Sequence, residues 1–92
     1  MTMQFDEYRA KLINKILFAS SREQVKTFIG EALQEMEQNK VNKDIVAVFA
    51  TKVISDLAAF SPMKKEAQQW DNIKVARILL NRVWIEINTP TN

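Results

Sequence analysis

Residues 70–87, WDNIKVARILLNRVWIEI, decide the fold because this helical pattern is apolar on two sides. A helix turns by about 100° per residue, so residues seven apart lie on nearly the same side. The second stripe contains Ile78 and Ile85, with that spacing. A helix on the outside of a small domain needs one apolar stripe. We therefore expect a helix that is central to the domain or that also contacts a second chain. The main stripe consists of Ile73, Ala76, Leu80, Val83 and Ile87.

Three further helices are expected before this one, at about residues 3–18, 22–38 and 43–60. Each has apolar residues at helical spacing. The chain contains one glycine and two prolines, so few turns can be built and the links between helices are short. Short links require neighbouring helices to run in opposite directions. The sequence thus predicts an all-α fold, a small antiparallel four-helix bundle with up-down-up-down topology, over a single domain at 1–92.

The helix starts carry recognisable caps. Ser20 with Glu23, or Ser21 with Gln24, has the spacing of a capping box at the start of the second helix. Asn42 is a favourable N-cap for the third helix. These side chains accept hydrogen bonds from backbone N–H groups that have no partner within the helix.

The fourth helix is expected to start at Ser61-Pro62 and to continue to about Ile87, followed by a frayed tail at 88–92. A helix of that length would extend beyond the other three. Asp71 and Asn72 are both good N-cap residues, so a break near this pair is an alternative to one long helix.

The composition removes several kinds of chemistry. The chain has no cysteine and no histidine, which excludes disulfides, thiolate metal sites and the commonest general base near neutral pH. A single glycine excludes the familiar glycine-rich phosphate loops. Glu31 and Glu35, four residues apart, have a spacing that could hold a hard cation, but we interpret them as a solvated acidic face. We therefore expect no catalytic residue, no cofactor and no metal site, and rank a small enzyme or ligand-binding bundle third.

The charge and hydropathy of the chain indicate its cellular location and the classes of partner that it can bind. Thirteen basic and eleven acidic side chains give a formal net charge of +2, too small to mark a nucleic-acid-binding protein by itself. No basic segment followed by an apolar run resembles a signal peptide, and no window approaches the roughly 18 apolar residues of a membrane span. The expectation is a cytoplasmic protein without a membrane partner.

Nucleic-acid association or a regulatory accessory role is the runner-up function, based on the basic side chains in or near the last helix. They are scattered around that helix, which weakens any phosphate-tracking stripe. The helix is also too apolar to serve as a recognition helix. The basic residues concerned are Lys64, Lys65, Lys74, Arg77 and Arg82.

Trp70, Arg77 and Trp84 form the sharpest constellation, because seven residues separate each from the next. A guanidinium at Arg77 could stack on an indole, and both residue types are enriched at binding hot spots. The competing interpretation is that the indoles fill the core while Arg77 extends past them. We favour the core interpretation, more strongly for Trp84 than for Trp70.

Ile13 and Leu17 widen the apolar face of the first helix, as Ile78 and Ile85 widen that of the last. The predicted function is non-catalytic protein–protein interaction. A homodimer that forms through these two helices and a monomer in which both helices are buried are about equally well supported. The expected partner is another protein or a second copy of this chain. The candidate interaction surface consists of Ile13, Leu17, Trp70, Arg77, Ile78, Trp84 and Ile85.

Overall fold

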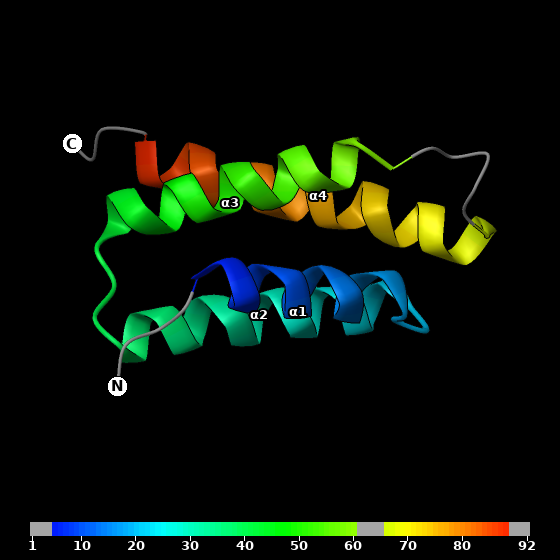
Figure 1. The fold of residues 1–92 in the computed structure, drawn as a ribbon, viewed down its shortest axis with the longest axis horizontal. Helices are drawn as coiled ribbons and strands as arrows, with labels where there is room; N and C mark the ends of the chain where they lie inside the picture. The colour runs from blue at the N-terminus through cyan, green and yellow to red at the C-terminus, as the bar shows by residue number, and fades with distance from the viewer. Residues whose placement is uncertain (1–4, 61–65, 89–92) are drawn as a thin grey trace.

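The computed structural model describes residues 5–60 and 66–88, which form four α-helices and no strand. Figure 1 shows that successive helices reverse direction along the long axis of the molecule. The all-α four-helix bundle predicted from the sequence is confirmed. The predicted start at Ser61-Pro62 lies outside the described residues, as do residues 89–92 of the tail predicted at 88–92; Asn88 itself is the last residue of α4. The helices are α1 (Phe5–Leu17), α2 (Arg22–Gln38), α3 (Lys43–Ala58) and α4 (Ala67–Asn88).

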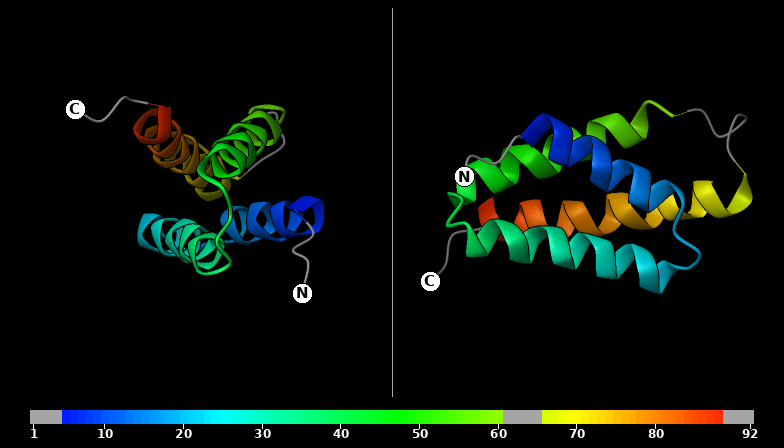
Figure 2. Two further views of the ribbon diagram at one scale, coloured as in Figure 1. Left: turned by 90° about the vertical axis from the view of Figure 1, so that its left-hand side faces the viewer. Right: turned by 60° about the horizontal axis from the view of Figure 1, so that its bottom comes forward.

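Viewed end-on, the helices occupy four corners, with α3 and α4 in one layer and α1 and α2 in the other (Figure 2). Helix α4 contacts all three other helices, and α1 contacts α4 across the diagonal. These contacts account for the main apolar stripe of α4 but not for the second one, because Ile78 and Ile85 remain exposed. In its main stripe Ile73, Ala76 and Leu80 are buried in the core, whereas Val83 and Ile87 near its end are half-buried.

The caps at the helix starts follow the sequence. Ser21 accepts a hydrogen bond from the backbone N–H of Gln24 at 3.2 Å, and Gln24 Oε1 accepts one from the N–H of Ser20 at 2.8 Å. The Ser21–Gln24 alternative is therefore confirmed. Asn42 Oδ1 accepts a hydrogen bond from the N–H of Asp44 at 2.8 Å, as its predicted role requires.

Helix α4 is continuous from Ala67 to Asn88, so the alternative of a break near Asp71-Asn72 is wrong and the single long helix is confirmed over these residues. Asn72 is fully buried, and its Nδ2 donates to the carbonyl of Ala19 at 2.8 Å and to that of Leu17 at 3.5 Å. Its Oδ1 accepts a hydrogen bond from Gln68 Nε2 at 2.9 Å. The side chain thus satisfies carbonyls at the end of α1 rather than capping its own helix.

Asp71 makes a second link to the same turn. Arg22, the first residue of α2, donates from Nε and Nη2 to the two carboxylate oxygens of Asp71, each at 3.0 Å. This hydrogen bonding from the guanidinium holds the pKa of the Asp71 carboxyl below its usual range. Adjacent polar residues of α4 therefore hold the end of α1 and the start of α2 together.

Gly30 offers a direct test of packing on α2. It is exposed within the helix at negative φ, and a Cβ at this position would meet no atom within 4 Å. We expect Gly30→Ala to raise the free energy of unfolding by about 1 kcal/mol, because alanine loses less backbone entropy in a helix. Thermal unfolding should show Tm higher by about 4–8 °C. A lower Tm would mean that another molecule packs against this side of α2.

Candidate protein-interaction surface

Five large apolar side chains are exposed on α3 and α4. One of them, Ile45 in the first turn of α3, lines neither hollow between the two helices, and the other four define what we call the α3–α4 face. The exposed fractions are 54% for Val48, 57% for Ile78, 41% for Trp84 and 48% for Ile85. Ile78 and Ile85 share the outward side of α4 because seven residues separate them. Exposed apolar residues are ordinary one at a time, but a group of them on one side of a small domain is typical of a binding surface.

Two shallow hollows lie between α3 and α4. One, of about 400 Å³, lies next to Ile54 and Ile78, and the other, of about 460 Å³, lies between Val48 and Trp84. The first hollow lies beside Ile54 of α3 and residues 74–81 of α4, and the second beside residues 44–52 of α3 and residues 84–88 of α4. The hollows therefore follow one another along the α3–α4 contact, and we refer to them together as the groove. The first is lined by Ile54, Lys74, Arg77, Ile78 and Asn81. The second is lined by Asp44, Ala47, Val48, Thr51, Lys52, Trp84 and Asn88.

The charges around this groove are mainly positive. Lys74 and Arg77 line its first hollow and Lys52 its second, while Arg82 lies on α4 between Ile78 and Ile85. Within residues 5–60 and 66–88, none of these four cations takes part in a salt bridge. Two nearby acids are paired elsewhere, Asp56 of α3 with Arg9 at 2.8 Å and Asp71 of α4 with Arg22 at 3.0 Å, while Asp44 lines the second hollow.

Three of the predicted site residues, Arg77, Ile78 and Trp84, line the two hollows. Ile85 is exposed on the same side of α4 as Ile78 but lines neither hollow. The expectation that Trp84 belongs to the core is wrong, because 41% of it is exposed and it lines the groove. Trp70 is half-buried and packs against the core. In the part of the chain that the structure describes, Arg77 makes no cation–π contact with either indole; the contact found is Lys15 above Phe28.

Ile13 and Leu17 are not part of this face. Both are half-buried and pack against the core from α1. Figure 2 shows that α1 and α4 stand at diagonal corners of the bundle, so their outward sides point in different directions. The surplus apolar residues of α1 and α4 therefore do not combine into one surface.

No protein-family model, curated protein or solved structure matches this chain. None of the helices in residues 5–60 and 66–88 combines the length and apolar character needed to cross a membrane. Among the same residues, no three acidic side chains gather in a way that would hold a metal ion.

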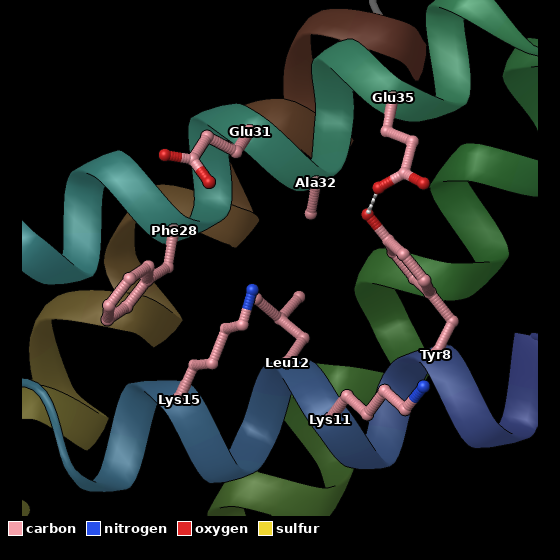
Figure 3. Close-up of a pocket in the computed structure, with 8 residues that line it drawn as sticks. All are labelled: Tyr8, Lys11, Leu12, Lys15, Phe28, Glu31, Ala32 and Glu35. Atoms are coloured by element: carbon pink, nitrogen blue, oxygen red, sulfur yellow. Dashed lines mark hydrogen bonds between the residues drawn. The ribbon is translucent and has the colours of Figure 1, made fainter.

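A smaller hollow, of about 100 Å³, lies between α1 and α2 (Figure 3). Here the Tyr8 hydroxyl donates a hydrogen bond to Glu35 Oε2 at 2.7 Å. Burial, and then this bond to a carboxylate, raise the pKa of Tyr8 far above its ordinary value, so the phenol stays protonated. Glu35 is thus used to join two helices, while Glu31 is exposed at the rim.

A third hollow, of about 510 Å³, lies where the ends of α2 and α4 meet the start of α3. Most of its lining is apolar, but Glu37, Glu86 and Lys43 place charges of both signs around it. It therefore does not select for either an anionic or a cationic ligand. It is lined by Leu33, Glu37, Val41, Lys43, Val46, Val83, Glu86 and Ile87.

Sequence reasoning missed two members of the α3–α4 face, Val48 and Lys52. A local signal for Val48 existed. It stands outside the apolar arc of 45–60 that includes Phe49, Val53 and Leu57, and it is followed four residues later by Lys52. An apolar residue on the polar side of a helix is the same pattern that drew attention to Ile78.

Proposed function

We propose that this chain is a non-catalytic interaction module that binds another protein through the α3–α4 face. The observation that carries the proposal is that three exposed apolar side chains, Val48, Ile78 and Trp84, line the hollows between α3 and α4, with Ile85 exposed beside them on α4. Tryptophan and arginine are the residue types most enriched at binding hot spots, and Trp84 and Arg77 line the two hollows of that groove.

Two features support a role without catalysis. The chain lacks histidine and cysteine, the side chains that most often act as base and nucleophile near neutral pH. Within residues 5–60 and 66–88, Asn72 is the buried polar residue, and its hydrogen bonds hold the α1–α2 turn. The buried polar side chain of Asn72 thus stabilises the fold and is not arranged for catalysis.

A different protein fits this face better than a second copy of the chain. In a two-fold dimer each partner presents the same patch. Lys52, Lys74 and Arg77 line the two hollows with Asp44 as the acid among their described residues, so two copies would each present net positive charge, which opposes the contact. Nucleic acid fits less well, because apolar side chains separate the cations where a phosphate track would need continuous positive charge.

The test is site-specific photo-cross-linking in cells of the source organism. A benzophenone amino acid replaces Ile78 on the α3–α4 face or, as a control, Gln34, which is exposed on α2. We expect an adduct of defined mass from position 78, no such adduct from position 34, and loss of the adduct when Trp84→Ala is added. Circular dichroism establishes that each variant is folded.

The outcomes separate the alternatives. Equal adducts from both positions, or no adduct from position 78, would contradict the proposal. Cross-linked dimers of the chain alone from position 78 would show that the face serves self-association instead.

A further inference from the structure

We infer that the segment bound by the α3–α4 face is an acidic amphipathic helix of another protein. This inference rests on the proposed function and adds the chemistry of the partner. Two observations carry it: the shape of the groove between two antiparallel helices, and the set of unpaired cations along it.

The groove has the dimensions of a helix seat. From Lys74 to Asn88 it follows 15 residues of α4, which at 1.5 Å per residue correspond to about 21 Å or four helical turns. Ala47, a small buried residue, lies at its floor between the larger Val48 and Trp84. An amphipathic helix placed in such a groove inserts side chains at i, i+3 or i+4, and i+7.

The cations select the polar side of that helix. Lys52, Lys74 and Arg77 line the groove, and Asp44 is the acid among the lining residues that the structure describes. A helix with glutamate or aspartate flanking its apolar stripe would pair with these cations. A basic helix, or the same face of a second copy, would meet repulsion instead.

The experiment uses two synthetic peptides of about five helical turns. Both carry leucine at the same heptad positions and differ only in having glutamate or lysine on the flanking positions. Binding of each labelled peptide to the full chain is measured by fluorescence anisotropy. We expect the glutamate peptide to bind at least about tenfold more tightly at 50 mM salt, with the difference shrinking at 500 mM as screening increases.

A charge-reversal variant makes the test specific. Lys74→Glu with Arg77→Glu should reverse the preference toward the lysine peptide, a result that partial unfolding cannot produce. Lys11→Glu with Lys26→Glu changes the net charge equally on exposed positions of the α1–α2 layer and should leave the preference unchanged. Trp84→Ala should weaken the binding of the glutamate peptide without reversing the preference.

Several results would overturn the inference. Equal binding of both peptides, or a preference that the reversal variant leaves intact, would show that the partner segment is not an acidic helix. The proposed function would still be decided by the cross-linking result at position 78. An oligonucleotide that binds more tightly than the glutamate peptide would assign the cations to nucleic acid. A dimer mass in light scattering at tens of micromolar, lost in Ile78→Glu with Ile85→Glu, would assign the face to a second copy.

Discussion

Asn72→Ala is expected to lower the free energy of unfolding by about 2–3 kcal/mol. The variant removes the donor that serves the carbonyls of Ala19 and Leu17, and the Asn72 side chain is fully buried. A buried carbonyl that loses its partner costs about 1–3 kcal/mol, and the lost packing of the amide adds to it. Thermal unfolding should show Tm lower by roughly 10–20 °C.

Gln68→Ala is the matched control for this prediction. It deletes the other hydrogen bond of the network, from Gln68 Nε2 to Asn72 Oδ1. Because this acceptor belongs to a fully buried residue, we expect a cost of about 1 kcal/mol, smaller than for Asn72→Ala, which removes both bonds to carbonyls and the packing of the amide. If the two variants unfold at the same temperature, the link from α4 to the α1–α2 turn contributes little to stability.

Asn72→Asp adds a pH test with a defined sign. A buried carboxyl has a raised pKa in the folded state, because burial disfavours its charged form. The variant should therefore be most stable below the unfolded pKa of about 4, and should lose stability as the pH rises through the folded value. Wild type has no carboxyl at position 72, so the stability difference between the two proteins should widen from pH 4 to pH 7.

Asn72 also shows where sequence reasoning reached its limit. The residue types that cap helices are recognised by short-range patterns, and these correctly located Ser21 and Asn42. Asn72 has the same chemistry, but its acceptors belong to residues 53 and 55 positions away. Only the packing of α4 against the end of α1 brings them together, so the local pattern suggested a helix cap at Asn72, and with it the alternative of a break, where the helix continues.

The candidate site divides in the same way. Heptad spacing located Ile78 and Ile85 on one side of α4, since that relation is internal to a helix. Whether Trp84 is covered, and whether Ile13 joins Ile78, depends on the order of helices around the bundle. Short links fixed the directions of the helices but did not place α1 and α4 at diagonal corners.

The two apolar stripes of α4 should differ sharply in their contribution to stability. Ile73 of the main stripe is fully buried, whereas 57% of Ile78 in the second stripe is exposed. We expect Ile73→Ala to cost about 2–5 kcal/mol, because it removes buried methyl groups and leaves a cavity. The same truncation in Ile78→Ala should change stability by no more than about 0.5 kcal/mol.

Urea unfolding of both variants at two protein concentrations checks this difference and bears on the interface. In a monomer, the small effect of Ile78→Ala is independent of concentration. If α4 were covered by a second copy, wild type would become more stable as its concentration rises, and the loss caused by Ile78→Ala would grow with it. Ile73→Ala should be equally costly at both concentrations in a monomer. Concentration-independent results for both variants would thus leave the second stripe free for a different protein.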